Sequence, residues 1–168
     1  MKARPKLTIQ LTNTDKTLEW LCLIILLVLW AGTILGFSKL PAQIPSHFNA
    51  AGQADDYSAK TSIFLLPVIA TIIYAGMTIL NKFPHLYNYP AAVTAENALR
   101  LYTSATRLIR ILKLSVILIF TGIVIMTYRS VFSENDGIGI WFLPAAMALI
   151  FVPILFYLVQ MSNSKHSV

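Results

Sequence analysis

Long apolar runs alternate with short polar segments along this chain. Four of the runs are long enough to cross a bilayer as helices, which takes about 20 predominantly apolar residues. We expect membrane-spanning helices at Thr17–Phe37, Ser62–Leu80, Ile111–Tyr128 and Ile140–Met161. The pattern therefore predicts an all-α integral membrane protein with four transmembrane helices, forming a single domain over residues 1–168.

A cleaved signal peptide is the rival interpretation of the first run, because basic residues precede it. The apolar core of a signal peptide has about 7–15 residues, which is shorter than this run. Three further runs follow, so we expect the first run to remain as a membrane span. Asn13 or Asp15 is the expected N-cap of its helix, since both residue types accept hydrogen bonds from free amides at a helix N-terminus.

The composition supports a membrane protein. Hydrophobic residues make up 57% of the chain and charged residues 12%, whereas a soluble domain has about 25% charged residues. The net charge is +6, and the basic residues flank the apolar runs. This placement indicates contact with anionic lipid headgroups and not with nucleic acid. Cys22 is the single cysteine, so it forms no intrachain disulfide, and we expect a small buried apolar side chain.

The positions of Lys and Arg predict the orientation, because cytoplasmic loops carry most of the positive charge. With both termini in the cytoplasm, only three of the 13 Lys and Arg residues lie on the outer side: Lys39, Lys60 and Arg129. The segment 40–60 then faces outward, and the loop that follows the second span faces the cytoplasm.

The later part of that cytoplasmic loop, at about 91–110, is expected to form an amphipathic helix. Its polar side chains recur at a spacing of three or four residues, as on one helix face: Glu96, Arg100, Thr103, Arg107 and Arg110. We interpret it as an interfacial helix before the third span, whose arginines form a basic face at the lipid headgroups. The alternative is a surface that docks a cytoplasmic partner. The polar residues 162–168 are expected to form a disordered tail.

The predicted spans carry no Asp, Glu, Lys, Arg or His near their middle, which argues against a proton-coupled pump. Gly32 and Gly36 form a GxxxG pattern, which lets two helices approach closely. We favour packing of these glycines within the chain, with a homodimer through Gly32 and Gly36 as the alternative.

The outer loop 40–60 is expected to be ordered. Pro41 and Pro45 shape its start, because proline prevents the first helix from continuing. The stretch Asn49–Gly52 is typical of a turn in which glycine takes a conformation that other residues avoid. Asp55 or Asp56 is then expected to cap a helical turn that leads into the second span.

Three interpretations compete for the polar residues of this loop. In the first, they only hydrogen-bond the loop to itself. In the second, they form a binding surface for a ligand or peptide. In the third, His47 acts as a base or metal ligand, Asp55 orients it or shares the metal, and Lys60 stabilises a developing anion. One histidine with carboxylates falls short of a usual zinc ligand set, and no catalytic residue is assigned.

The same loop resembles a known signature. Its fixed residues match the pattern LPxxIPxHFNxxGxxDxxxxK: Leu40, Pro41, Ile44, Pro45, His47, Phe48, Asn49, Gly52, Asp55 and Lys60. The signature marks a small bacterial membrane domain of unknown function. That domain also occurs in SdpI-type proteins, which give immunity to a secreted toxin and take part in signalling its presence. The resemblance covers roughly Trp20–Leu80, and implies a multi-pass protein of the bacterial cytoplasmic (inner) membrane whose outer loop is its functional face.

We therefore expect a non-enzymatic binding, sensing or immunity-type protein whose outer loop recognises a peptide, lipid or protein partner. The expected functional residues are His47, Phe48, Asn49, Gly52, Asp55 and Lys60. One alternative is a membrane-embedded metal-dependent hydrolase or transferase that uses His47, Asp55 and Lys60. Another is an accessory subunit of a transporter or other membrane complex. No cofactor is predicted for the binding protein, whereas the hydrolase adds a divalent metal held by His47 and Asp55.

Overall fold

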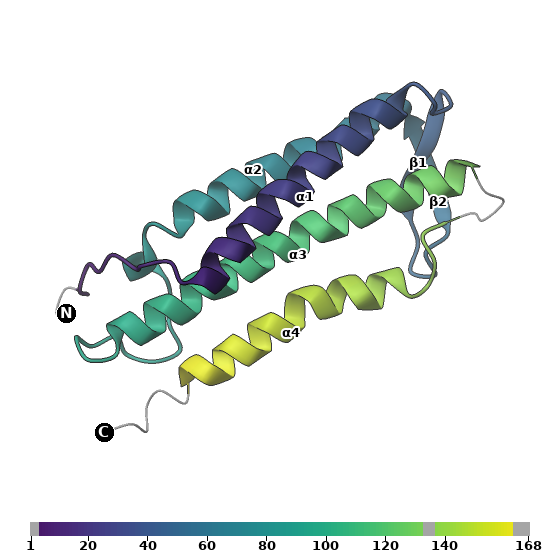
Figure 1. The fold of residues 1–168 in the computed structure, drawn as a ribbon. Helices are drawn as coiled ribbons and strands as arrows, with labels where there is room; N and C mark the ends of the chain where they lie inside the picture. Colours follow the sequence, from purple (N-terminus) through teal and green to yellow (C-terminus); the bar gives the residue numbers. More distant parts are fainter. Residues whose placement is uncertain (1–3, 133–136, 163–168) are drawn as a thin grey trace.

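A computed structural model describes residues 4–132 and 137–162 of the chain (Figure 1). It contains four long helices, and each is long and apolar enough to cross a membrane. They are α1 (Asn13–Phe37), α2 (Leu65–Leu80, extended at its start by the short 3-10 helix η1, Lys60–Phe64), α3 (Ala98–Phe132) and α4 (Phe142–Ser162). The prediction of four spanning helices is confirmed.

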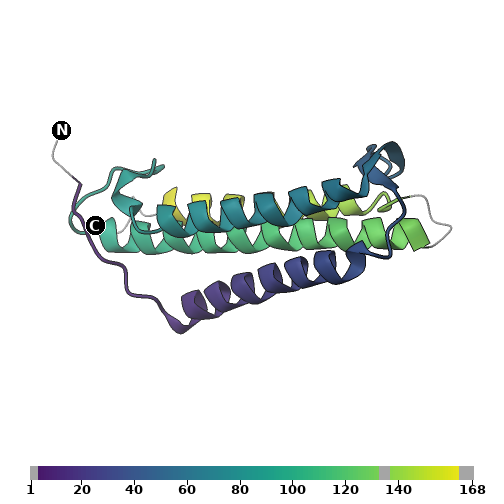
Figure 2. The ribbon, with the colours of Figure 1, turned by 90° about the horizontal axis from the view of Figure 1, so that it is seen from above.

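Helix α3 is the centre of the fold. It packs against α1, α2 and α4, whereas the main helical neighbour of α4 is α3. Figures 1 and 2 show α3 running between the other helices, with the segment before α1 and the end of α4 at one end of the molecule. The segment between α1 and α2 lies at the opposite end (Figure 1). The molecule therefore has two ends with different chemistry, separated by the length of the helices.

Helix α1 begins at Asn13, earlier than the predicted Thr17. Thr12 and Asp15 form a capping box: the Asp15 amide donates to Thr12 Oγ1, and the Thr12 amide donates to Asp15 Oδ2. This box satisfies backbone amides that would otherwise lack partners at the helix start. The prediction of Asn13 or Asp15 as N-cap was wrong, because Thr12 is the N-cap and Asp15 is the third residue of the helix.

The amphipathic helix predicted at about 91–110 is not a separate element. Its second half belongs to α3, which runs without interruption from Ala98 to Phe132 and contains no proline that would break it. The residues before Ala98 form a loop in which Thr94 and Asn97 bond each other reciprocally, at 2.8 and 3.4 Å. The tail predicted at 162–168 lies outside the described residues, except for Ser162 at the end of α4.

The segment 40–60, which was predicted to face outward, contains a β-hairpin, so the fold is mostly but not entirely helical. Strand β1 (Gln43–Phe48) pairs antiparallel with β2 (Ala54–Ala59), from Gln43 opposite Ala59 to Phe48 opposite Ala54. The prediction that this loop is ordered fits the hairpin. The prediction that Asp55 or Asp56 caps a helical turn was wrong, because both residues lie within β2.

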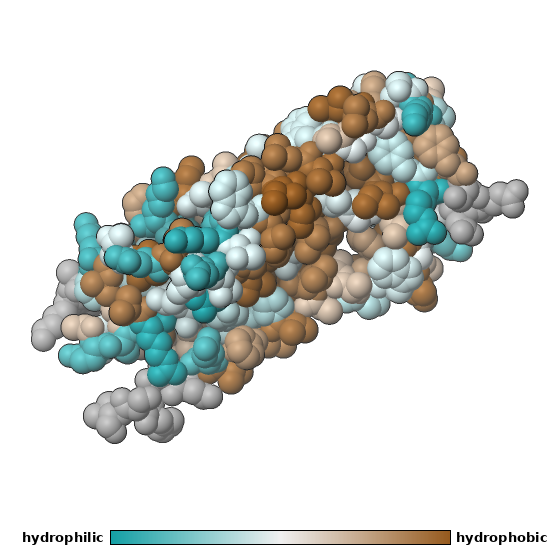
Figure 3. Space-filling view, viewed as in Figure 1, coloured by the Kyte–Doolittle hydropathy of each residue, from teal (hydrophilic) through white to brown (hydrophobic). Residues whose placement is uncertain are grey.

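The outer surface is apolar over the middle of the molecule. Figure 3 shows a hydrophobic band between two hydrophilic ends, and the larger hydrophilic region lies at the end with the chain termini. Large apolar side chains are exposed on all four helices, among them Leu35, Ile72, Ile125 and Phe156. Such a contiguous apolar surface is typical of helices that face lipid, and it fits a multi-pass membrane protein.

Two buried clusters hold the helices together. The first joins α1, η1, α2 and α3 around Cys22, which is fully buried as predicted. The second lies near the terminal end and joins α3 to α4 through Tyr102 and Tyr157, with Tyr87 and Tyr89 of the preceding loop packed against it. Burial raises the pKa of Tyr87 to about 12, so its hydroxyl stays protonated and donates to the Leu80 carbonyl at 2.7 Å.

Gly36 is used for packing within the chain. A Cβ at Gly36 would lie 2.5 Å from the Tyr128 ring, and the Tyr128 hydroxyl donates to the Thr33 carbonyl at 3.2 Å. A Cβ at Gly32 would meet no atom within 4 Å. This contact favours the intramolecular interpretation for Gly36, and the homodimer stays a prediction.

These glycines make a matched pair for mutation. We expect Gly36→Ala to lower the free energy of unfolding by about 1–3 kcal/mol, since the Tyr128 ring must move. Gly32→Ala should be neutral or stabilising by up to about 1 kcal/mol, because alanine favours helix. Thermal unfolding in detergent measures both, and size-exclusion chromatography reports the oligomeric state. Equal losses for the two variants, or a loss of dimer with Gly32→Ala, would favour the homodimer instead.

Candidate functional site

The turn of the hairpin is held by Asn49 and Gly52. The Asn49 side-chain carbonyl accepts from the amides of Ala51 and Gln53 at 2.9 and 3.1 Å, and the Gly52 amide donates to the Asn49 carbonyl at 2.8 Å. Gly52 has φ +77°, a conformation that glycine adopts without strain. The predicted turn at Asn49–Gly52 is confirmed: Asn49 acts in it through its side-chain carbonyl, and Gly52 through its backbone conformation.

A backbone contact, called the clasp below, joins this turn to residues 137–139, which precede α4. The Ile138 amide donates to the Gly52 carbonyl at 2.8 Å, and Gln53 forms an isolated β-bridge with Gly137. The approach is so close that a Cβ on Gly52 would lie 2.4 Å from the Gly139 carbonyl oxygen. Sequence reasoning missed this contact, because the glycines at 137 and 139 carried no signal beyond their residue type.

His47 and Asp55 form a hydrogen-bonded pair across the hairpin. His47 Nδ1 lies 2.5 Å from Asp55 Oδ1, and the side chains are 68% and 42% exposed. The strand register shifts on either side of His47, and such bulges re-aim side chains. A carboxylate only accepts hydrogen bonds, so Nδ1 carries the proton in this bond and Nε2 is left for another partner. The structure brings together two of the predicted site residues.

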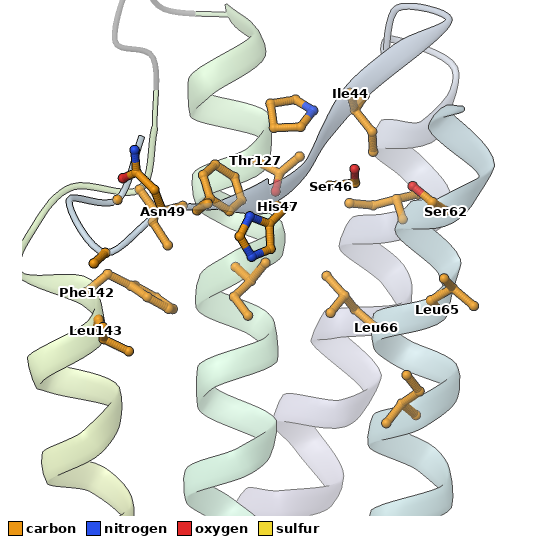
Figure 4. Close-up of a pocket in the computed structure, with 18 residues that line it drawn as sticks. Ile44, Ser46, His47, Asn49, Ser62, Leu65, Leu66, Thr127, Phe142 and Leu143 are labelled. Atoms are coloured by element: carbon orange, nitrogen blue, oxygen red, sulfur yellow. The ribbon is translucent and has the colours of Figure 1, made fainter. Parts of the chain in front are cut away.

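A pocket of about 680 Å³ lies beneath the hairpin (Figure 4). Its walls come from β1, from η1 and the starts of α2 and α4, and from the C-terminal third of α3. Apolar side chains dominate the lining, including Ile69, Ile123 and Phe142. In Figure 4 the His47 ring lies between Phe142 of α4 and Leu66 of α2. The pocket therefore has an apolar interior with a polar group at the hairpin side.

The remaining polar groups of the lining are few. They come from Ser46 and Asn49 on the hairpin side, Ser62 in η1 and Thr127 on α3 (Figure 4). The Ser62 and Ser58 hydroxyl oxygens lie 2.7 Å apart and share a hydrogen bond. A mostly apolar pocket with a small number of placed polar groups is the usual form of a small-molecule site.

Other predicted loop residues have separate roles. Phe48 and Pro45 line the pocket, and Pro45 is buried, whereas Pro41 is exposed. Lys60 is not brought to the His47–Asp55 pair: its ammonium lies 3.4 Å from the Leu40 carbonyl and 4.8 Å from the centre of the Phe37 ring. These contacts place Lys60 where α1 ends and η1 begins.

The His47–Asp55 pair provides two of the ligands that a divalent metal would need. Among the residues that the structure describes, no three His, Cys, Asp or Glu side chains group closely enough to hold a metal ion. A structural zinc site takes about four protein ligands, so these residues do not fit one. A metal at this pair would rely largely on water or on a bound ligand for its other positions.

The predicted basic face at the other end of the molecule does not exist as one surface. Arg100 is exposed, but Arg110 is buried and Arg107 is only partly exposed. Arg107 Nε donates to Asp15 Oδ1 at 2.9 Å, and Arg110 Nε donates to Glu19 Oε1 at 3.1 Å. The structure departs from the predicted face at Arg110, which is buried, because α1 packs along α3 and presents carboxylates to both arginines.

Lys113 completes this cluster, and sequence reasoning missed the roles of both Lys113 and Glu19. Lys113 is fully buried and donates to Glu19 Oε2 at 2.6 Å and to Thr78 Oγ1 at 2.9 Å. Its ammonium also lies 4.6 Å from the centre of the Tyr74 ring. The available signal was the presence of Glu19 and Lys113 just inside predicted spans, where charged groups need partners.

Comparison with known proteins finds similarity for part of the chain. Residues 23–71 match a family described as a domain of unknown function (DUF1648), and this region runs from α1 through the hairpin into α2. An "Uncharacterized protein" of Archaeoglobus fulgidus is 34% identical over 89 residues, which cover 48% of this chain and 49% of the relative. The chain thus spans about half the length of that relative, and no solved structure matches it. The predicted domain of unknown function is supported, and the link to SdpI-type proteins stays a prediction.

Proposed function

We propose that the protein is a non-enzymatic membrane binding protein, and that the pocket beneath the hairpin takes an amphipathic lipid. The observation that carries this proposal is the pocket itself, with apolar helix walls and the His47–Asp55 pair at one side. The apolar chain of the lipid would lie along α2 and α4, and its polar group would meet His47. A sensing or immunity role, as in the resembling family, would use the same binding step.

The membrane setting explains how a lipid reaches the pocket. Leu65 and Ile69 on α2 and Leu143 on α4 line it and are also exposed on the apolar outer surface. A chain can therefore pass from the bilayer between these helices without crossing water. Because lipid chains are as apolar as such walls, this transfer gains little free energy by itself. Selectivity for one lipid over others must then come from the contact between the polar group of the lipid and His47.

The orientation of the protein is part of the proposal. The hairpin end carries Lys39, Lys60 and Arg129, and most other Lys and Arg residues lie toward the terminal end. This asymmetry supports cytoplasmic termini and an outward-facing hairpin in a bacterial inner membrane. The lipid would then come from the outer leaflet.

One observation favours a second candidate, a hydrolase or transferase. A histidine whose Nδ1 is held by a carboxylate, with Nε2 left free, is the arrangement of a general base. His47 and Asp55 have this arrangement beside a pocket. Water activated at Nε2 could attack an ester of a bound lipid, with or without a metal at the pair.

A binding experiment tests the first candidate. We expect purified protein in detergent to bind a radiolabelled lysophospholipid, and His47→Ala to weaken binding about tenfold, because the hydrogen bond that the free glycerol hydroxyl of the lipid donates to Nε2 is lost. Ile69→Trp should also weaken it by filling the apolar part of the pocket. His85→Ala is the matched control, since it removes a histidine near the other end. Scintillation proximity measures all four proteins.

Two results would contradict this proposal. Equal affinity of all four proteins would show that the lipid binds elsewhere, and preference for an apolar peptide would indicate a peptide partner. Release of the fatty acid in a manner that depends on His47 would instead support the hydrolase.

A further inference from the structure

We propose a second binding site at the terminal end of the molecule, where the charge cluster on α1 and α3 holds the phosphate of an anionic membrane lipid through Arg107. The cluster consists of Asp15, Glu19, Arg107, Arg110 and Lys113. It is distinct from the pocket beneath the hairpin, and the proposal does not depend on the lipid proposed there.

The cluster has an unbalanced charge. Arg107 pairs with Asp15, while Arg110 and Lys113 share Glu19, at 3.1 and 2.6 Å. Three cations therefore face two carboxylates, which leaves a formal charge of +1. Among residues 4–132 and 137–162 the other acids lie elsewhere: Asp55 and Asp56 in β2, and Glu96 exposed before the start of α3.

Burial makes this imbalance costly. Lys113 is 0% exposed, and Asp15 and Arg110 are 1% and 5% exposed. Charges in a low-dielectric interior are normally paired, because an uncompensated charge loses its hydration without a partner. Thr78 and the Tyr74 ring solvate Lys113 but bring no negative charge. A third anion from outside the chain would balance the cluster.

Arg107 is the cation of the cluster that an anion can reach. Its side chain is 27% exposed, compared with 6% for Arg110 and 0% for Lys113. Its Nε and Nη2 donate to Asp15 and Thr12, and the guanidinium also donates a hydrogen bond to the Tyr157 hydroxyl of α4. At least one of the five N–H groups of Arg107 is then left for an outside anion. The open side of Arg107 thus lies between α1 and α4, and guanidinium groups suit phosphate oxygens.

The depth of the cluster in the membrane favours the phosphate of a lipid headgroup as the anion. About 20 helical residues span the hydrocarbon core of a bilayer. Measured from the end of α1 at Phe37, a stretch of this length ends in the helical turn that precedes Glu19. Asp15 and Arg107 therefore lie at the level of the headgroups. Lys16 is exposed next to Asp15 on α1, and such a cation attracts anionic headgroups.

Charge variants with opposite expected effects test the proposal. The probe is short-chain phosphatidylglycerol added to the full-length protein in detergent, with affinity measured by native mass spectrometry. Glu19→Gln raises the surplus charge and should strengthen binding about fivefold, whereas Lys113→Met removes the surplus and should weaken it about fivefold. Arg107→Lys keeps the charge but loses the planar fork, and should also weaken binding. Arg100→Gln removes an exposed charge of the same helix and should change affinity less than twofold.

The expected increase in phosphatidylglycerol affinity with Glu19→Gln cannot result from misfolding, because a misfolded protein would not bind the lipid more tightly. The proposal is overturned if the Glu19→Gln and Lys113→Met proteins bind phosphatidylglycerol like the unmodified chain, or if Arg100→Gln has the largest effect. Inorganic phosphate is the second arm. If it binds as tightly as the lipid and shows the same variant pattern, the source is free phosphate and the lipid assignment fails.

Discussion

Asp15→Ala is expected to lower the free energy of unfolding by about 3–5 kcal/mol, because it leaves Arg107 without its carboxylate partner. Asp15 is 1% exposed and accepts two hydrogen bonds from Arg107, at 2.9 and 3.2 Å. It also accepts from Thr12 at the start of α1, and loss of such a cap costs about 1 kcal/mol in addition. Chemical denaturation in detergent, followed by circular dichroism, measures the loss.

The matched control for this prediction is Asp56→Ala. Asp56 is an exposed carboxylate in β2, and surface substitutions of this kind change stability by less than about 0.5 kcal/mol. A second test combines Asp15→Leu with Arg107→Met, which replaces both charges by apolar groups. Replacement of a whole buried pair is often neutral, so the double variant should recover most of the stability. If Asp15→Ala is as stable as Asp56→Ala, the ion pair does not hold α1 against α3.

Gly52→Ala is expected to open the clasp between the hairpin turn and residues 137–139. The new Cβ would lie 2.4 Å from the Gly139 carbonyl oxygen, and the backbone has φ +77°. The backbone conformation alone costs about 1–3 kcal/mol for a residue with a side chain, and the close contact adds to it. The Ile138 amide should then lose its bond to the Gly52 carbonyl and exchange its hydrogen faster. Hydrogen exchange with mass spectrometry on the peptide around Ile138 measures this.

Gly76→Ala is the control for the clasp. Gly76 lies within α2, and a Cβ there would meet no atom within 4 Å, so its exchange pattern and stability should stay close to those of the unmodified chain. Because the pocket lies between the hairpin and the first turn of α4, opening the clasp should also weaken lysophospholipid binding. Unchanged protection of Ile138 in the Gly52→Ala protein would show that the turn tolerates a side chain and that the clasp is not tight.

The site was predictable where its geometry is local. The turn at Asn49–Gly52 depends on contacts within a few residues, and residue types alone indicated it. The pairing of His47 with Asp55 required the hairpin register, because the residues lie eight apart and on different strands. The clasp required residues 137–139 to reach the turn, which no local pattern encodes. The pocket follows from all of these contacts and from the placement of α2 and α3.

The sequence by itself determined the number and approximate position of the spanning helices, because a helix needs an apolar run of about 20 residues to cross a bilayer. It also determined that the chemistry lies at the two ends of the molecule. The direction of the charged side chains at the terminal end was decided only by the tertiary structure. Periodicity shows which residues share a helix face, but not what that face meets. Arg107 and Arg110 are turned toward α1 because carboxylates 92 and 91 residues away in the sequence lie opposite them on that helix.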